Sequence, residues 1–317
     1  MKLKVLLGSA ALMAASGAAA QDWPNRPITL VVPFQAGGIT DIVARKLEPA
    51  LSEFLDQSIV VVNMGGHTSV GTRRVVDANP DGYEFLVHET GIMTAEASGV
   101  QEFGYRDLTP VAVVGEVCLV AVGRADANWR TLSEIGETSD GPLIAGVTVG
   151  GASHMAIAMA AELGGFEIRP VQIGGTSAAF AALIAGQIDL MASTPSSAHS
   201  YIFDANDQLL ENPEATPLLY LGAERHALLP DVQAMQDAGS DSELCVPNLI
   251  FAPSGTPDDI VSRMAEGLEH AYRQPDGLMD FFHTVGGVDR FISGDELGAY
   301  LDANWAILEP LAASAGN

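Results

Sequence analysis

The sequence predicts an α/β protein of two lobes, each a mainly parallel sheet covered by helices. Short β-branched runs alternate with glycine-containing loops and helical segments along the chain, which is the rhythm of parallel strands joined through helices. The chain has 317 residues, a length typical of about two domains. Its hydrophobic content of 48% is enough for a large core, and it excludes a disordered acidic protein.

The first third of the chain contains strand, loop and helix units. Apolar residues recur at four-residue spacing from Val43 to Leu55, which predicts an amphipathic helix. Pro49 lies inside that helix, so we expect a kink or an early end there. A second helix should end near Ala78, before a strong Asn-Pro-Asp-Gly turn. Short buried strands are expected at residues 27–33, 59–62 and 83–87.

The remainder repeats this pattern. Residues 111–122 form an unusually long β-prone run. A late helix has Thr256 as its expected N-cap and Pro257 at its first position, followed by acidic residues. Further helices should begin near residues 131, 152 and 178. Further strands are expected at residues 143–147, 168–173, 188–191 and 249–253.

Residues 1–20 have the pattern of a cleaved secretory signal peptide. Lys2 and Lys4 precede an apolar run, which ends in an A-x-A match at residues 18–20. A buried N-terminal helix is the alternative. Cleavage would leave 13 basic residues against 40 acidic ones and change the net charge from −25 to −27. No later segment reaches 18 uninterrupted apolar residues, so the mature chain is expected to be soluble.

Composition and motifs exclude several classes of protein. The acidic charge excludes general nucleic-acid binding, which needs a basic surface. The chain has 2 cysteines, too few for a disulfide framework or a Cys-rich metal site. It contains no G-x-S-x-G elbow, no G-x-x-x-x-G-K-[ST] loop and no H-E-x-x-H helix. We therefore expect no catalytic residue, no metal and no cofactor.

Four glycine-containing loops each follow an expected strand and precede an expected helix, at residues 35–41, 65–69, 149–154 and 174–177. In open parallel sheets this is the carboxyl edge, where ligands bind. The first N–H groups of a helix have no internal partner, so they can bind anions. Two such loops per lobe could therefore hold a carboxylated ligand from both sides. Taken singly, each loop could also be an ordinary tight turn.

Several ordered motifs resemble one family. Residues 33–41 resemble a P-F-x-x-G-G-x-T-D loop, and residues 79–83 an A-P-D-G-Y turn. Residues 185–191, 229–232 and 251–257 resemble G-G-Q-V-D-x-M, L-P-D-V-P and F-A-P-x-G-T-P segments. Together they resemble the substrate-binding proteins of tripartite tricarboxylate transporters, also called the Bug family.

The resemblance implies a fold and a function. The fold is a two-lobed periplasmic binding protein of type II-like clamshell form, with a signal peptide at 1–20. The first lobe would be discontinuous, at 21–111 and 222–317, and the second would cover 112–221. The protein would be a periplasmic monomer that binds a small carboxylate and delivers it to the large and small membrane subunits of the transporter.

The resemblance also implies the residues of the site. Gln35 to Gly38 would supply backbone N–H groups to one carboxylate. Asp41 could sense the ligand, but it is at least as well explained as a first-turn residue matched to the helix dipole. The expected contacts of the first lobe are Phe34, Gln35, Ala36, Gly37, Gly38, Asp41, Gly66, His67, Thr68, Ser69 and Thr90. Those of the second lobe are Gly151, Ser153, His154, Gly175, Thr176, Ser177 and Ser193.

Departures from the family pattern affect the expected ligand. Ile173-Gly174-Gly175 stands in place of Y-K-G, so a lysine is absent. Residues 192–195 replace F-D-N-L-P, so an aspartate is absent as well. The site should therefore be more neutral than usual, and tricarboxylate specificity does not follow from the family name. We expect the acidic residues on the outer surface and a locally neutral or positive cleft.

Three questions stay open from sequence. Cys118 and Cys245 could form a disulfide, if their Cα atoms lie within about 7 Å, or remain two buried thiols. The same clamshell could present its ligand to a signalling receptor. The protein could also be a secreted α/β enzyme with His154 as base and Ser153 as nucleophile, although no third orienting group is identifiable.

Overall fold

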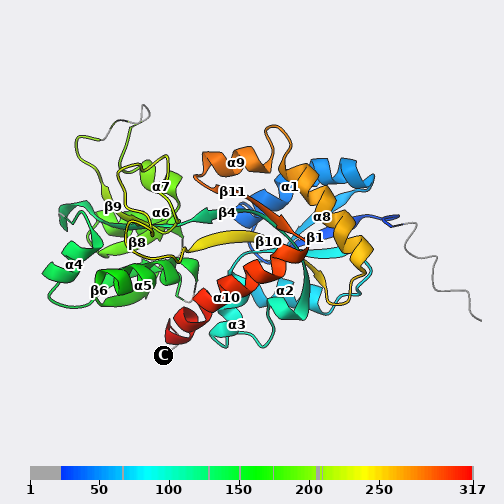
Figure 1. Cartoon of the computed structure of the whole chain (residues 1–317), viewed down its shortest axis with the longest axis horizontal. Coiled ribbons are helices and arrows are strands. Elements are labelled where there is room, and N and C mark those ends of the chain that lie inside the picture. Colours follow the sequence, from blue (N-terminus) through cyan, green and yellow to red (C-terminus); the bar gives the residue numbers. More distant parts are fainter. Residues whose placement is uncertain are drawn as a thin grey trace, which may run out of the picture.

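The protein consists of two α/β lobes placed side by side (Figure 1). The computed structural model describes residues 23–65, 68–127, 129–149, 151–173, 175–204, 208 and 210–315. The expected signal peptide and the predicted site residues Gly66 and His67 lie outside these ranges. No described helix combines the length and the apolar character that a membrane span needs.

The first lobe is built on a six-stranded sheet with the order β11-β4-β10-β3-β1-β2. Its strands are β1 (Ile28–Val32), β2 (Ile59–Asn63), β3 (Glu84–His88), β4 (Leu108–Cys118), β10 (Cys245–Pro253) and β11 (Val288–Ser293). The helical segments are α1 (Ile39–Leu55), α2 (Thr68–Val76), α3 (Gly91–Ala97), a 3₁₀ turn (Tyr105–Asp107), α8 (Asp258–Tyr272), α9 (Leu278–Thr284) and α10 (Asp295–Ala315). Strands β1, β2 and β3 are parallel, whereas β10 is antiparallel to both β3 and β4.

Helix α1 shows why the local sequence folds as it does. Val43, Leu47, Leu51 and Leu55 are buried and share one core with strand β1, so their four-residue spacing forms the inner face of the helix. Burial of each such side chain contributes about 1.5–3 kcal/mol. The helix runs through Pro49 to its end at Leu55, so the expected early end is not found. The apolar stripe on both sides of the proline keeps the helix on the sheet.

The second lobe is built on a five-stranded sheet with the order β7-β6-β8-β5-β9. Its strands are β5 (Val120–Arg124), β6 (Leu143–Val147), β7 (Ile168–Gln172), β8 (Leu190–Ser193) and β9 (Ala215–Tyr220). The helical segments are a 3₁₀ turn (Ala125–Ala127), α4 (Leu132–Thr138), α5 (Ala152–Gly164), α6 (Thr176–Ile184) and α7 (Pro195–His199). Strands β6, β7 and β8 are parallel, and β5 is antiparallel to both β8 and β9.

Both sheets are therefore mixed, and the expectation of mainly parallel sheets needs correction. Each sheet has three parallel strands, and the others run antiparallel to their neighbours. The reason is that the chain returns from one lobe to the other. A strand that leaves a lobe and a strand that enters it pair in opposite directions, as β4 and β10 do in the centre of Figure 1.

The chain passes between the lobes twice, at Leu119 after β4 and at Leu244 before β10. Leu119 separates β4 from β5, so the long β-prone run is divided between the two sheets, and the first passage lies beyond the expected boundary at 112. Leu221, which follows β9 of the second lobe, lies beside both passages. The amide of Leu221 donates to the carbonyl of Leu119 at 2.8 Å, and the amide of Leu244 donates to Leu221 at 2.8 Å. The amide of Leu119 donates to Leu244 at 3.4 Å. The two passages and Leu221 thus form one hydrogen-bonded junction.

A disulfide joins the two passages. Cys118 and Cys245 are directly opposite each other on β4 and β10, with their Cα atoms 3.7 Å apart. The bond closes a loop with a sequence separation of 127. The alternative of two buried thiols is therefore not what the structure shows. Helix α10 adds a further connection, because it packs on α3 of the first lobe and on α5 of the second (Figure 1).

Removal of the disulfide should lower stability. The bond restrains the unfolded chain over a long loop, so we expect Cys118→Ala/Cys245→Ala to reduce the free energy of unfolding by about 2–4 kcal/mol. Urea denaturation of the wild type and the double variant measures this difference. Reduction of the wild type by dithiothreitol should give the same loss. Equal midpoints for the oxidised wild type and the variant would contradict the expectation.

Candidate ligand-binding site

The carboxyl edges of both sheets face the junction between the lobes. Strand β10 begins beside the junction at Cys245, and its Leu249 pairs with His88 at the end of β3. Because β1 and β2 are parallel to β3, their carboxyl ends point the same way. In the second lobe, Val120 pairs with Ser193 at the end of β8, and β6 and β7 run parallel to β8. The loops after these strands therefore approach the interlobe region from opposite sides.

The first loop is exposed and begins helix α1. Gln35, Ala36, Gly37 and Gly38 are all exposed, and Gly37 has a φ of +87° that favours glycine. Gly38 is the N-cap of α1 in an extended conformation. The first amides of α1 follow it and have no carbonyl partner within the helix. These residues can therefore offer backbone donors to a ligand, as the sequence predicts.

Asp41 holds this loop in place. It is 3% exposed, and its two carboxylate oxygens accept from the Gly37 amide at 2.7 Å and from Asn63 Nδ2 at 2.9 Å. Arg45 Nε also lies 2.9 Å from Asp41 Oδ1. These contacts bind the loop after β1 to the end of β2. Asp41 is thus a positioning residue, which agrees with the structural alternative raised from sequence.

The protonation of Asp41 follows from these contacts. Burial alone would raise its pKa, but hydrogen bonds from Arg45, Gly37 and Asn63, together with the charge of Arg45, hold the pKa below its ordinary value. The carboxylate is therefore ionised at neutral pH. Its charge is balanced by Arg45 inside the same cluster, so it adds little net charge to the loop.

Asn63 also helps to hold the loop after β1, although it is not among the site residues that the sequence predicts. Its Nδ2 donates to Asp41 and, at 3.4 Å, to the carbonyl of Phe34, and its Oδ1 accepts from Arg45 at 2.9 Å. The sequence feature that could have indicated this role is a polar residue directly after the β-branched run 59–62. An amide there can serve both donors and acceptors of a neighbouring loop.

The loop after β3 carries a second omitted residue, Glu89. Thr90 is buried, and its hydroxyl donates to Glu89 Oε2 at 2.8 Å, so this predicted contact stabilises the loop internally. Burial raises the pKa of Glu89, while hydrogen bonds from Thr90 and Gly91 act in the opposite direction. Beside it, His88 stacks edge-on against Phe34 at 5.1 Å. Burial lowers the pKa of His88 to about 4, so this imidazole is neutral at pH 7.

In the second lobe, Ser153 braces the loop that begins α5. Its Oγ accepts from the Thr148 amide at 2.9 Å, and Gly151 is the N-cap of the helix. His154 is 4% exposed, and burial lowers its pKa. Adjacent residues of a helix do not face each other, so Ser153 and His154 are poorly arranged as nucleophile and base.

The loop that begins α6 resembles the first loop in its exposure. Gly175 is the N-cap with a φ of +91°, and Gly175, Thr176 and Ser177 are all exposed. Ser193, by contrast, is buried, and its hydroxyl donates to the carbonyl of Thr194 at 3.1 Å. The structure therefore leaves Thr176 and Ser177 exposed at the carboxyl edge of the second sheet and holds Ser193 inside the lobe.

The charges agree with the expectation of a near-neutral site. Among the described residues, only Asp41 and Glu116 are buried acids, so the acidic excess lies towards the surface. The loops after β1, β3, β6, β7 and β8 contain no Lys or Arg in their described residues. Glu89 is the one acid in these described segments apart from the paired Asp41, and burial raises its pKa.

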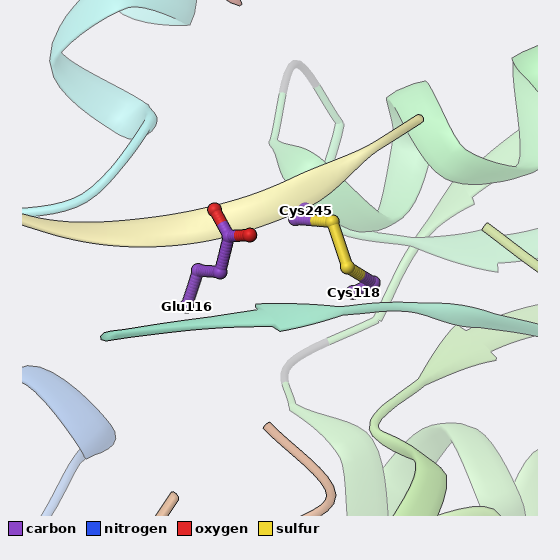
Figure 2. Close-up of side chains that lie close together, drawn as sticks. All are labelled: Glu116, Cys118 and Cys245. Atoms are coloured by element: carbon purple, nitrogen blue, oxygen red, sulfur yellow. A yellow bond between two sulfur atoms is a disulfide. The ribbon is translucent and has the colours of Figure 1, made fainter. Parts of the chain in front are cut away.

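A metal site is not supported. In the described part of the chain, Glu116, Cys118 and Cys245 place ligand-type atoms within 4.8 Å of one another (Figure 2). The two sulfur atoms are bonded to each other, so neither is the thiolate that a metal requires.

Two surface pockets lie elsewhere. One, of about 420 Å³, includes Arg26 and Arg74, but these pair with Asp81 and Glu84 at 2.9 and 2.6 Å, so they are not free to bind an anion. The other, of about 720 Å³, lies on the second lobe around β9.

Comparisons with known proteins identify related chains. Residues 43–295 match the sequence model of a family described as the tripartite tricarboxylate transporter family receptor. A UPF0065 protein from the tcbD-tcbE intergenic region of Pseudomonas sp. strain P51 is 31% identical over 291 residues. The match covers 86% of this chain and 82% of that relative.

Solved structures share the two-lobed fold. MatC from Rhodopseudomonas palustris, with bound malate, is 26% identical and has a TM-score of 0.70. The match covers 93% of this chain and 100% of MatC. Rpa4515 from R. palustris, with adipate, is 26% identical with a TM-score of 0.74, and the match covers 93% and 99% of the two chains.

Substitution of Asp41 should destabilise the first lobe. Asp41→Asn places an amide donor against donors from Gly37, Asn63 and Arg45, so we expect a loss of about 1.5–3 kcal/mol in the free energy of unfolding. Asp77→Asn is the matched control, because its ion pair with Arg73 is exposed and should contribute only about 0.3–0.5 kcal/mol. Equal effects of the two substitutions would overturn the bracing role of Asp41.

The contribution of Asp41 should also depend on pH. Its pKa is lowered in the folded protein, so its stabilisation is complete above the unfolded value of about 3.9. It is lost as the pH falls through the folded pKa. The stability gap between wild type and Asp41→Asn should therefore close in strong acid. Urea titrations from pH 7 to pH 2 measure this gap, and a constant gap would contradict the assignment.

Proposed function

The chain belongs to the tripartite tricarboxylate transporter receptor family, and from this premise we propose that it captures a small carboxylate between its lobes. The family and its structural neighbours are solute-binding receptors and not enzymes. We further propose that it works in the periplasm as a monomer and passes the ligand to the large and small membrane subunits of its transporter. The bound malate and adipate of the neighbours support a carboxylate as ligand.

One observation carries the proposal: exposed helix starts from the two lobes approach the same region. Helices α1, α5 and α6 have 17, 13 and 9 residues, and each begins at a glycine N-cap on the carboxyl edge of its sheet. The unpaired N–H groups and the positive dipole end of each helix favour an anion. A carboxylate accepts several such donors without a lysine or arginine partner.

The helix starts of the two lobes offer different sets of hydrogen-bond donors. The Gly37 amide is used by Asp41, which leaves the amides of Gly38, Ile39 and Thr40 for the ligand in the first lobe. In the second lobe, Thr176 and Ser177 are exposed residues, and each carries an amide and a hydroxyl donor. A ligand that joins both sets stabilises the closed arrangement of the lobes, because only that arrangement supplies all the donors.

The acidic surface is compatible with anion capture. The formal net charge of −25 repels anions at long range, so steering does not assist association. At physiological salt the Debye length is about 8 Å, and distant surface acids are largely screened. The short-range helix donors then determine affinity, while the large acidic excess serves solubility.

A carboxylate should raise the melting temperature of the protein. We expect malate, succinate, adipate or citrate to stabilise the folded state in proportion to its binding, as thermal shift measurements will show. Dimethyl adipate is the matched control, because it retains the adipate skeleton without the anionic groups. A broad panel of mono-, di- and tricarboxylates that gives no shift would refute the proposed function.

One substitution tests the backbone donors of α1. Ile39→Pro removes a single amide at the first position of the helix, where proline is tolerated, and Gly38 already has the extended ψ of 168° that precedes proline comfortably. Loss of a hydrogen bond to a charged group should weaken carboxylate binding by about tenfold or more. Isothermal titration calorimetry with the best acid of the panel measures the change.

The matched control for this substitution is Asp258→Pro. It occupies the same position of α8, after Pro257 with a ψ of 140°. Strand β10 runs away from the junction before α8 begins, so this helix start lies at the opposite edge of the first lobe. Asp258→Pro should leave affinity unchanged, and equal losses in both variants would exclude a specific role for the α1 amide.

A further inference from the structure

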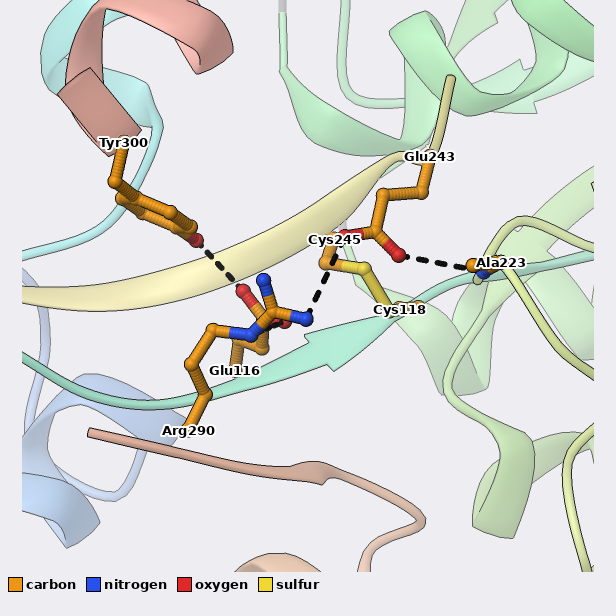
Figure 3. The surroundings of a disulfide bond; sticks show 7 residues. All are labelled: Glu116, Cys118, Ala223, Glu243, Cys245, Arg290 and Tyr300. Atoms are coloured by element: carbon orange, nitrogen blue, oxygen red, sulfur yellow. Dashed lines mark hydrogen bonds and ion pairs between the residues drawn. A yellow bond between two sulfur atoms is a disulfide. The ribbon is translucent and has the colours of Figure 1, made fainter. Parts of the chain in front are cut away.

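An ion-pair network that contains one buried glutamate lies beside the disulfide at the junction (Figure 3). Glu116 of β4 is 1% exposed, and its Oε1 lies 2.7 Å from Nε of Arg290 on β11. The hydroxyl of Tyr300 on α10 donates to Glu116 Oε2 at 2.6 Å. Burial raises the pKa of Glu116, while Tyr300 and Arg290 oppose that rise. Such a carboxylate is costly to bury unless it is paired, so the network needs all three groups.

The same arginine reaches the second passage. Arg290 Nη2 lies 3.5 Å from Oε1 of Glu243, the residue directly before Leu244. The other oxygen of Glu243 accepts from the Ala223 amide at 3.3 Å, two residues after Leu221. One chain of contacts therefore runs from Glu116 through Arg290 and Glu243 to Ala223.

This set of residues holds both interlobe passages. Glu116 and Cys118 lie at the first passage, Glu243 and Cys245 lie at the second, and Ala223 follows the neighbouring Leu221. The disulfide joins the two passages, and Glu243 joins the second passage to Ala223 (Figure 3). We name the residues Glu116, Cys118, Ala223, Glu243, Cys245 and Arg290 the hinge clamp.

We propose that the hinge clamp makes the two interlobe passages a single rigid hinge, and that its disulfide limits how freely the lobes move when no ligand is bound. A protein that samples fewer arrangements loses less conformational entropy on binding. An opened disulfide therefore increases the mobility of the free protein and weakens capture. This last consequence rests on the proposed function, whereas the rigidity of the junction does not.

Amide hydrogen exchange tests the proposal without any ligand. We expect Cys118→Ala/Cys245→Ala to accelerate exchange of the Leu119, Leu221 and Leu244 amides by about tenfold under native conditions. The amides of Val31 and Ala145, on inner strands of the two sheets, should change far less. Dithiothreitol treatment of the wild type provides the same test in an unchanged sequence. Each dithiothreitol gives two electrons and two protons to the disulfide, which yields two thiols and cyclic oxidised dithiothreitol.

A second pair of variants tests the ion pair between Glu243 and Arg290. Glu243→Gln removes the charge that faces Arg290 but keeps an oxygen for the Ala223 amide, so it should accelerate exchange at Leu221 and Leu244 by about threefold. Glu269→Gln is the control, because its pair with Arg273 is exposed on a single helix. This variant should leave the three junction amides unchanged.

The outcomes are distinct. Faster exchange confined to the junction supports the clamp. Unchanged exchange, or an equal increase in the sheet centres, overturns it, because the disulfide would then contribute nothing or only global stability. Adipate affinity gives a separate readout, with Kd expected to rise about threefold to tenfold in the reduced protein. Failure of adipate and every other acid to bind refutes the proposed function but leaves the exchange result to decide the clamp.

Discussion

The structure depends on one constraint: the chain leaves the first lobe and returns to it at one place. The passages at Leu119 and Leu244 and the adjacent Leu221 pair with one another through backbone hydrogen bonds, so none of the backbone polar groups of these three residues is left unsatisfied at a buried junction. Strands that lead into and out of this junction run antiparallel to their neighbours. The parallel strands β1–β3 and β6–β8 then have their carboxyl ends towards it. The pairing that joins the lobes therefore also directs the binding loops towards each other.

Polar side chains hold the binding loops in place, and the backbone amides of these loops remain for the ligand. Asp41, Asn63 and Arg45 fix the loop after β1, and Ser153 fixes the loop before α5. These polar side chains satisfy one another, so they bring little net charge to the site. Neutral loops with free amides suit an anion that would otherwise face a strongly acidic protein, because amides retain their dipoles where surface charge is screened.

The sequence predicts the elements well where a pattern is local. The expected strands before the glycine loops become β1, β2, β6 and β7, and these loops lie at their carboxyl ends. Long-range relations are harder to predict. The run from 111 to 122 reads as one strand, but Leu119 divides it between two sheets, because pairing with β10 and β9 depends on residues more than 90 positions away. Asn63 and Glu89 were omitted for a similar reason, since only folding shows which neighbouring loop a polar strand end will meet.

The central claim is that one carboxylate contacts helix starts from both lobes. Amide NMR spectra of the labelled protein, titrated with adipate or the best-binding acid, test this most directly. The account predicts saturable shifts at Ile39 and Thr40 together with Thr176 and Ser177, all with a single Kd. Shifts confined to one lobe, or to the pocket near Arg26 and Arg74, would contradict capture between the lobes.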